Sequence, residues 1–181
     1  MTDELVNIVN EQDEVVGTEM KSVCHKQGLR HRVSAIFLFN NDKDIWVQKR
    51  AQGKLGAGLL DYSASGHVPA GDSYVSSAYR EMREELGIDP RLEYLTQGLI
   101  ENDDLETPEF IRIRHNLALF RGFYENRFEL QKKEFKLQKE EVESIELYSL
   151  DKLKEIMRKN PEKLTEGFKV GINYLLEKNE S

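Results

Sequence analysis

Three glutamates, Glu81, Glu84 and Glu85, have the spacing in this sequence that most clearly points to chemistry. In a helix, positions i, i+3 and i+4 point within one arc of about 100°. Like charges at this spacing destabilise a helix by roughly 0.2–0.5 kcal/mol per pair, so they are most useful where a cation lies against them. Carboxylate oxygens suit Mg²⁺ or Mn²⁺. The spacing therefore predicts a site for a hard divalent ion, and a solvated acidic helix face is the alternative.

A helix between Ser73 and Gly87 must carry these glutamates. Apolar side chains recur there at about 100° per residue, which predicts a stripe that faces the core and glutamates that point away from it. Gly87 is predicted to end the helix. The stripe consists of Val75, Ala78, Tyr79, Met82 and Leu86.

The glutamates belong to a longer pattern. It begins Gly66-His67-Val68-Pro69-Ala70-Gly71-Asp72 and, after seven residues, continues Arg80-Glu81-Met82-Arg83-Glu84-Glu85-Leu86-Gly87-Ile88. This pattern resembles the Nudix box of MutT-like hydrolases, G-x5-E-x7-R-E-U-x-E-E-x-G-U with U aliphatic, over residues 66–88. It departs from the box at Asp72, which stands where the family has its first glutamate.

The resemblance implies a fold and a reaction. It implies an α/β protein, the Nudix α/β/α sandwich with a mixed β-sheet, as a single domain over residues 1–181. It implies hydrolysis of a diphosphate linkage in a small substrate by metal-activated water. Mg²⁺ is the expected ion and Mn²⁺ the alternative; the implied metal ligands are Glu81, Glu84, Glu85 and the Gly66 carbonyl. Arg80 would orient the carboxylates, so that Arg80, Glu81 and Glu84 are the predicted catalytic residues of the box.

A general base outside the box is also implied, because many family members take one from a late loop before the last strand. Glu140 and Glu141 occupy that region here. The segment 131–143 is rich in Lys and Glu, so a solvated hairpin is the alternative interpretation.

Basic residues near the box are candidates for binding the substrate phosphates. Lys49, Arg50 and Lys54 follow a predicted strand, and charge-assisted hydrogen bonds from them would reach a distal phosphate. Arg83 is a further candidate. Solvated positions explain all four equally well. Arg112 and Arg114 alternate on another predicted strand and either line the pocket or face water.

Histidines link the chain to one branch of the family. His25, His31 and the pair Gly66-His67 lie at places similar to those in isopentenyl-diphosphate isomerase-like Nudix proteins, where a histidine-rich metal site and a cysteine before Gly-His support proton transfer on a prenyl diphosphate. Ser65 replaces that cysteine, and the strand 111–115 lacks the expected acidic pair. We therefore favour a hydrolase, with the isomerase as the alternative. His25, His31 and His67 are candidates for an accessory metal site, and ordinary hydrogen-bonded roles are the competing interpretation.

The remaining elements follow from hydrophobic periodicity and turn residues. An N-terminal hairpin is predicted over about residues 5–18 and core strands over 33–39 and 45–48. Further strands are predicted over 92–100, 111–123 and 145–149, with loops over 51–58 and 101–109. Two helices are predicted within about 151–178, the first over 151–159 and the second opened by Pro161.

Composition limits the setting and the partners. The chain has 181 residues, 39% of them hydrophobic, a single cysteine and a formal net charge of −7. One domain, a cytoplasmic location and no membrane segment are expected. The acidic balance argues against nucleic acid as a partner but not against a small anionic substrate, because a bound cation supplies local positive charge. The family resemblance also suggests a homodimer.

A third hypothesis is a nucleotide-sensing module that has the fold but no turnover. The intact acids of the box argue against it. The substrate stays open among nucleoside di- and triphosphates, nucleotide sugars, dinucleoside polyphosphates and coenzyme A derivatives, because selectivity depends on loops.

Overall fold

The computed structural model describes residues 3–104, 111–123 and 132–179. The strands are β1 Leu5–Val9, β2 Val15–Met20, β3 His31–Phe39, β4 Ile45–Arg50, β5 Leu60–Asp61, β6 Ala64–His67, β7 Arg91–Asp104, β8 Ile111–Phe123 and β9 Val142–Tyr148. The α-helices are α1 Lys21–Gln27, α2 Tyr74–Leu86, α3 Leu150–Lys159 and α4 Glu166–Asn179, and short 3-10 helices are η1 Lys132–Glu134 and η2 Pro161–Lys163.

The strand β3 is the centre of one mixed sheet. Its parallel partner β8 pairs with it from His31 to Leu38. Antiparallel partners succeed one another along β3: β1 at His31, β6 from Val33 to Ile36, and β4 at Leu38 and Phe39. Since β8 lies along one edge of β3, the strands β1, β6 and β4 lie along its other edge. β4 and β6 pair with different parts of β3. The box strand β6 is thereby placed beside the start of β4.

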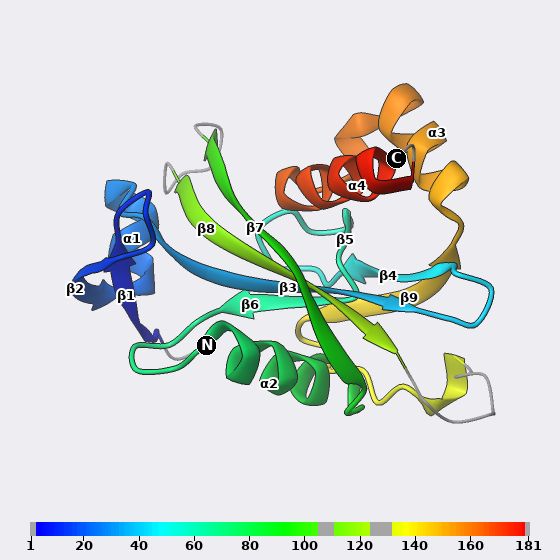
Figure 1. Cartoon of the computed structure of the whole chain (residues 1–181), viewed down its shortest axis with the longest axis horizontal. Coiled ribbons are helices and arrows are strands. Elements are labelled where there is room, and N and C mark those ends of the chain that lie inside the picture. The colour runs from blue at the N-terminus through cyan, green and yellow to red at the C-terminus, as the bar shows by residue number, and fades with distance from the viewer. Residues whose placement is uncertain (1–2, 105–110, 124–131, 180–181) are drawn as a thin grey trace.

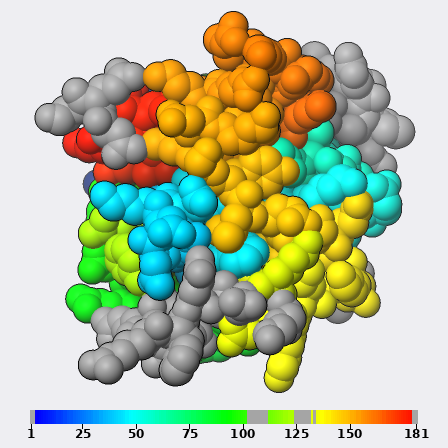
Figure 2. Space-filling view, turned by 90° about the vertical axis from the view of Figure 1, so that its right-hand side faces the viewer, coloured from blue at the N-terminus to red at the C-terminus, as the bar shows by residue number. Residues whose placement is uncertain are grey.

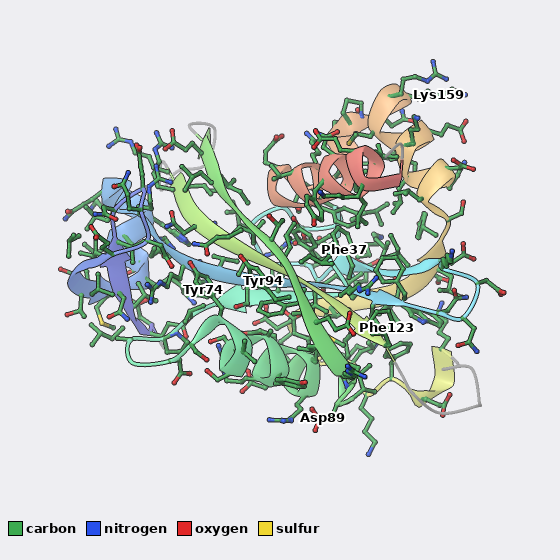
Figure 3. The ribbon with its side chains drawn as sticks, viewed as in Figure 1. Phe37, Tyr74, Asp89, Tyr94, Phe123 and Lys159 are labelled. Atoms are coloured by element: carbon green, nitrogen blue, oxygen red, sulfur yellow. The ribbon has the colours of Figure 1, made fainter. Side chains whose placement is uncertain are left out.

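Helices cover both faces of the sheet, which confirms the predicted α/β/α sandwich (Figure 1). Alternate residues of β3 point to opposite faces, as a strand requires. Ala35 and Phe37 belong to the core under α3 and α4, whereas Ile36 and Leu38 belong to the core under α2. Figure 3 places Phe37 between the sheet and α4, and its ring centroid is 5.9 Å from that of Phe168.

The helix α2 forms where the sequence predicts it. Ser73 caps its start by accepting a hydrogen bond from the Ser76 amide at 3.1 Å. Gly87 ends it in the left-handed region, at φ 69°, a conformation that glycine adopts without steric cost. Ala78, Met82 and Leu86 are fully buried, but Val75 is 49% exposed, so its assignment to the core stripe is wrong. Tyr74 packs against the core instead.

Two further local predictions are wrong, and one short helix was not predicted. The helix α1 was missed because it is only seven residues long and its N-cap, Met20, offers no side-chain hydrogen bond. Residues 101–104 extend β7 rather than opening a loop, since they pair with residues 111–114 of β8. Pro161 opens the 3-10 helix η2, and the second helix, α4, begins later, at Glu166.

The N-terminal hairpin β1–β2 is attached to the sheet by a polar network around Asp13. The Asp13 carboxylate accepts hydrogen bonds from Arg32 Nε at 2.9 Å, Tyr74 Oη at 2.9 Å and Asn116 Nδ2 at 3.1 Å. Burial opposes ionisation, but these hydrogen bonds outweigh it and hold the pKa of Asp13 below its ordinary value. The hairpin and α1 lie at one end of the sheet (Figure 1).

The opposite end of the molecule is closed by β9 and α3. On the face in Figure 2 these segments, in amber and orange, lie between the β3–β4 turn and the loop that follows β4. β9 pairs with β4 from Ile45 to Arg50. This pairing brings residues just before β9 next to the loop 51–58, on which predicted phosphate-binding residues stand. Among the described residues, no helix is long and apolar enough to cross a membrane.

Candidate active site

A cavity of about 1090 Å³ brings most of the predicted site residues together. One wall is the carboxylate cluster, which we define as Glu81, Glu84 and Glu85. A second wall comes from the loop after β4 and the segment before β9. The third includes histidines, and aliphatic side chains fill the space between the walls. These aliphatic residues include Val33, Leu55, Leu59, Ile100, Ile113, Leu117 and Leu164.

Two members of the carboxylate cluster are buried. Glu81 is 7% and Glu85 6% exposed, whereas the Glu84 side chain is 53% exposed. The prediction that all three point away from the core is therefore wrong for Glu81 and Glu85, because β6 packs against that flank of α2. Glu85 lies where β4 and β6 separate: its Oε2 accepts from Gln48 Nε2 at 3.2 Å and from the Ser65 amide at 3.3 Å.

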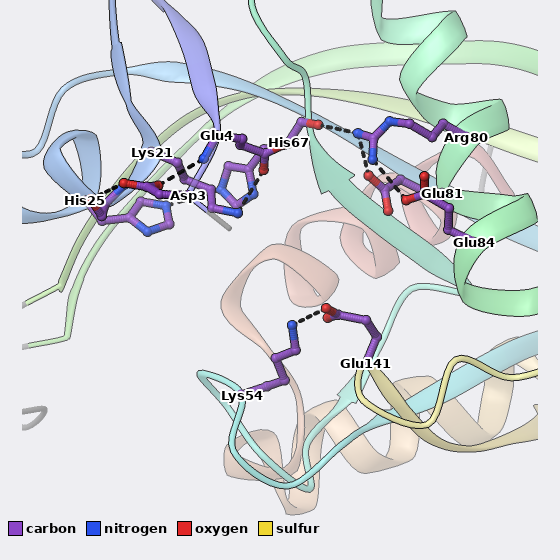
Figure 4. Close-up of polar contacts among 11 residues, drawn as sticks. Asp3, Glu4, Lys21, His25, Lys54, His67, Arg80, Glu81, Glu84 and Glu141 are labelled. Carbon is purple, nitrogen blue, oxygen red and sulfur yellow. Dashed lines mark hydrogen bonds and ion pairs between the residues drawn. The ribbon is translucent and has the colours of Figure 1, made fainter. Parts of the chain in front are cut away.

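Arg80 connects this cluster to β6. Its guanidinium lies 2.7 Å from Glu81 Oε1 and 3.1 Å from Glu84 Oε2. Its Nη2 also donates to the His67 carbonyl at 3.0 Å. Figure 4 shows Arg80 between the two carboxylates and the end of β6. This geometry suits the orienting role that the box resemblance implies for Arg80.

Burial makes the carboxylate cluster costly without a cation. It raises the pKa of Glu81 to about 7, against the opposing effect of Arg80, and the nearby Glu84 adds to the rise. Burial, with the Glu81 charge, raises the pKa of Glu85 well above its usual value. Either a proton or a metal ion offsets this cost.

Gly66 provides the test of whether the site fits a metal. A Cβ atom at this position would collide with the Glu81 carboxylate, so only glycine allows β6 to approach α2 this closely. The carboxylate oxygens are thereby held against the β6 backbone, and a cradle of buried carboxylates and a close backbone is the donor set that hard divalent ions take. The residues present therefore fit Mg²⁺ or Mn²⁺.

Opposite the carboxylate cluster, Lys54 forms an ion pair with Glu141 (Figure 4). Both side chains line the cavity. Glu140, the other predicted general base, is exposed and lies outside the lining. The described part of the segment before β9 forms the 3-10 helix η1 rather than a hairpin. Most of its residues are exposed, as the alternative interpretation expected, but Phe135 is buried against Trp46.

The other basic candidates have separate positions. Arg50 lines the cavity, but its Nη1 forms an ion pair with buried Asp61 at 2.7 Å. Lys49 pairs with Glu143 at 2.6 Å, and Arg83 with Asp89 at 3.1 Å, both outside the lining. Of the four, only Lys54 and Arg50 line the cavity.

Asp72 and the strand arginines also lie outside the cavity lining. Asp72, the position at which this chain departs from the box, is exposed in the turn before α2. On β8, Ile113 and His115 line the cavity. Arg112 and Arg114 alternate with them and therefore point to the other face of the strand.

Four histidines converge at the end of the cavity near α1. His25, His31 and His67 were predicted together, and His115 joins them; each offers a ring nitrogen within 4.8 Å of the others. We call these four residues the histidine cluster. His115 was not named with the other three because it stands far along the chain on β8, and only the parallel pairing of His31 with His115 makes them neighbours.

The imidazoles of this cluster are held in the neutral form. Burial lowers the pKa of His25 to about 4, with further contributions from His31 and Lys21. Burial likewise lowers the pKa of His31, and lowers those of His67 and His115 well below the usual value. Neutral imidazoles keep a lone pair that can bind a metal.

Comparison with known proteins identifies the family. The NUDIX domain family matches residues 29–168, and the chain belongs to this family. An isopentenyl-diphosphate Delta-isomerase of Serratia proteamaculans (strain 568) is 30% identical over 171 residues, which cover 92% of this chain and 88% of that relative. A Nudix hydrolase of Deinococcus radiodurans is 37% identical over 90 residues, covering 49% of this chain and 53% of that protein.

Solved structures agree on the fold. The crystal structure of DR0079 from Deinococcus radiodurans superposes on this chain with a TM-score of 0.67, at 22% identity, and covers 87% of this chain and 90% of that one. At this identity the likeness shows the Nudix fold alone. The family therefore contains relatives of both the hydrolase and the isomerase kind, and the site chemistry has to separate the two.

Proposed function

We propose that this protein is a metal-dependent hydrolase that cleaves a diphosphate linkage in a small substrate. The observation that carries the proposal is the carboxylate cluster, buried against Gly66 and organised by Arg80, in one cavity with the Lys54–Glu141 pair. Glu81, Glu84, Glu85 and the Gly66 carbonyl would hold Mg²⁺ or Mn²⁺. When bound, the ion supplies positive charge against diphosphate oxygens and makes water more acidic.

The side chains around the cavity have separate roles in this reaction. Arg80 orients Glu81 and Glu84, and its own position is fixed by the His67 carbonyl. Lys54 and Arg50 meet the phosphates from the opposite wall. A phosphate that arrives there competes with Glu141 for the Lys54 ammonium and leaves the Glu141 carboxylate available as a base.

Glu141 is proposed as the general base because, of the two candidates, it is the one that lines the cavity. Its carboxylate takes the proton of the attacking water as the water oxygen bonds to phosphorus. The bond from that phosphorus to the bridging oxygen breaks, and the electron pair leaves with the second phosphate. The products are two phosphate-containing fragments.

An isomerase is the second candidate, favoured by the similarity to the Serratia isomerase along almost the whole chain. Two features of the site argue against it. Ser65 stands in the cavity wall where the resemblance places a cysteine. An unassisted hydroxyl is a much weaker acid than a thiol and does not form the anion that would accept a proton near neutral pH. His115, rather than a carboxylate, is the ionisable group that β8 contributes to the histidine cluster.

The experiment is a product assay with Mg²⁺ on a panel of diphosphate compounds, run beside an isopentenyl diphosphate isomerisation assay. The panel contains nucleotide sugars, nucleoside di- and triphosphates, dinucleoside polyphosphates and coenzyme A derivatives. Hydrolysis of at least one member that stops on chelation and returns with Mg²⁺ is the expected result. Isomerisation without hydrolysis, or nucleotide binding without release of any product, overturns the proposal.

A further inference from the structure

We propose that Asp61 is a positioning residue for the diphosphate: it holds the Arg50 guanidinium in the orientation that binds a phosphate and keeps it away from the other acids of the cavity. The inference rests on the proposed function, because that function assigns Arg50 to the substrate. Asp61 is the last residue of β5, and its side chain borders the cavity but is only 6% exposed. Asp61 therefore acts through Arg50 rather than on the substrate itself.

The guanidinium of Arg50 is held by the protein through two of its nitrogens. Nη1 donates to Asp61 Oδ2 at 2.7 Å, and Nε donates to the Leu55 carbonyl at 2.8 Å. Among the described residues, Nη2 has no hydrogen-bond partner. Because the guanidinium is planar, fixing two nitrogens also fixes the third. Arg50 lines the cavity, so Nη2 is the donor that remains for a phosphate.

The Asp61 carboxylate is itself fixed through its second oxygen. Oδ1 accepts hydrogen bonds from Thr165 Oγ1 at 2.8 Å and from the Tyr62 amide at 2.9 Å. The Thr165 hydroxyl also accepts from the Phe168 amide at 3.2 Å, at the start of α4. Asp61 thus joins the end of β4, the strand β5 and the start of α4. A carboxylate that is bound on this side can hold Arg50 in one orientation.

The charge of Arg50 has to be compensated, because the residue is largely buried. Burial opposes this charge, but Asp61 outweighs the effect and keeps the pKa of Arg50 above its ordinary value. Glu85 and Glu141 also favour the charged form of Arg50, and both line the cavity. They are a proposed metal ligand and the proposed general base. Without Asp61, Arg50 is expected to pair with one of them, which would remove both partners from the reaction.

A purely electrostatic role for Asp61 predicts the opposite effect on binding. Its negative charge lies beside Arg50 and repels an incoming anion, so that removal of the charge alone would strengthen phosphate binding. If Asp61 positions Arg50, its removal weakens phosphate binding, because the guanidinium loses its orientation and pairs with other acids. The sign of the change in affinity therefore separates the two roles.

The test measures diphosphate binding without turnover. Methylenediphosphonate, whose P–C–P bridge is not hydrolysed, is titrated calorimetrically into the full chain with Mg²⁺ present. Asp61→Asn keeps the shape of the side chain and is expected to bind the diphosphonate about tenfold more weakly, as for the loss of one charge-assisted hydrogen bond. Asp89→Asn is the matched control: it removes the acid of an ion pair with Arg83 outside the cavity lining and should leave the affinity unchanged. Equal or tighter binding by Asp61→Asn overturns the proposal.

A double-mutant cycle shows whether Asp61 acts through Arg50. Arg50→Gln alone should weaken binding by at least the same factor, and addition of Asp61→Asn should then cause no further loss. Additive losses overturn the positioning role. Arg50→Lys leaves Asp61 in place and keeps the charge, but not the planar fork of donors, and is expected to bind the diphosphonate several-fold more weakly. Unchanged affinity of Arg50→Lys contradicts the proposal even if Asp61→Asn does not fold.

These outcomes are separable from those of the product assay. If the wild type binds the diphosphonate and Asp61→Asn binds it equally well, the role of Asp61 is overturned and the proposed hydrolysis is unaffected. If the wild type does not bind the diphosphonate, the role of Arg50 at the phosphates is overturned together with that of Asp61. Hydrolysis is judged from product release alone.

Discussion

The carboxylate cluster and three members of the histidine cluster, His25, His67 and His115, line one cavity, but the two clusters are assembled in opposite ways. The three glutamates come from five consecutive positions of α2, whereas the four histidines come from four elements spread over ninety-one residues, from His25 to His115. Burial acts on both and in opposite directions: it raises the pKa of Glu81 and Glu85 and lowers those of the histidines.

The two clusters therefore present different donor atoms to the same cavity. Buried carboxylates gain most from a hard ion, which offsets their desolvation. Neutral imidazoles offer nitrogen lone pairs and attract borderline metals. Arg80 connects the two clusters, since its guanidinium contacts both the Glu81 carboxylate and the His67 carbonyl.

The largest expected effect is on turnover and comes from a change in the carboxylate cluster. Glu84→Gln removes a carboxylate from the proposed metal site and keeps the side-chain volume, so turnover is expected to fall by about 10²–10³-fold, the loss typical of one electrostatic group in an active site. The exposed Asp72 of the same box is the control: Asp72→Asn should retain activity. Steady-state kinetics with Mg²⁺ compares the two variants. An equal loss of turnover in both would show that lining the cavity does not distinguish the residues that act in the reaction.

A second prediction concerns the wall opposite the carboxylate cluster. Glu141→Gln removes the proposed base and is expected to lower kcat by about 10²-fold, with a smaller effect on KM, because Lys54 stays available to the phosphates. Glu140→Gln, one residue earlier and outside the cavity, should leave kcat unchanged. Full activity of Glu141→Gln would mean that another residue is the general base.

A third prediction tests the close approach of β6 to α2. Gly66→Ala forces a methyl group against the Glu81 carboxylate, and overpacking of this kind costs about 1–3 kcal/mol of the free energy of unfolding. Gly98→Ala, on β7, meets nothing within 4 Å and should be neutral. Denaturant unfolding of both variants measures the contrast; equal stability would mean that α2 shifts freely.

The smallest expected effect lies in the turn of the N-terminal hairpin, at Asp13. Asp13 has φ 65°, a conformation that asparagine tolerates, so Asp13→Asn removes the charge without new backbone strain. Loss of the charged hydrogen bonds is expected to cost roughly 1 kcal/mol near neutral pH.

The pH dependence of this loss has a defined sign. Because the pKa of Asp13 in the folded protein lies below its ordinary value of 3.8, the charge stabilises the fold above that pH and the benefit disappears as the pH falls through the folded pKa. The stability difference between wild type and Asp13→Asn, measured by thermal unfolding, should shrink below about pH 4. A difference that stays constant from neutral to acidic pH would assign the effect to shape rather than charge.

Local patterns allowed much of the fold to be predicted. The helix α2 and its end at Gly87 follow from apolar spacing and a glycine, both of which act within a few residues. Val75 was misplaced because the side of α2 that meets the sheet depends on how Tyr74 packs. The helix α1 lacked any local signal, since it is stabilised by contacts with other elements.

The amino-acid sequence by itself determined the three glutamates that share a helix face and the family, because the box pattern lies within residues 66–88, and the sandwich fold followed as what the family resemblance implies. Only the tertiary structure decided that Glu81 and Glu85 are buried, that Glu141 rather than Glu140 faces the cavity, and that His115 completes the histidine cluster. These facts depend on which strands pair and which helix covers them, and burial and long-range pairing arise from the packing of the whole chain.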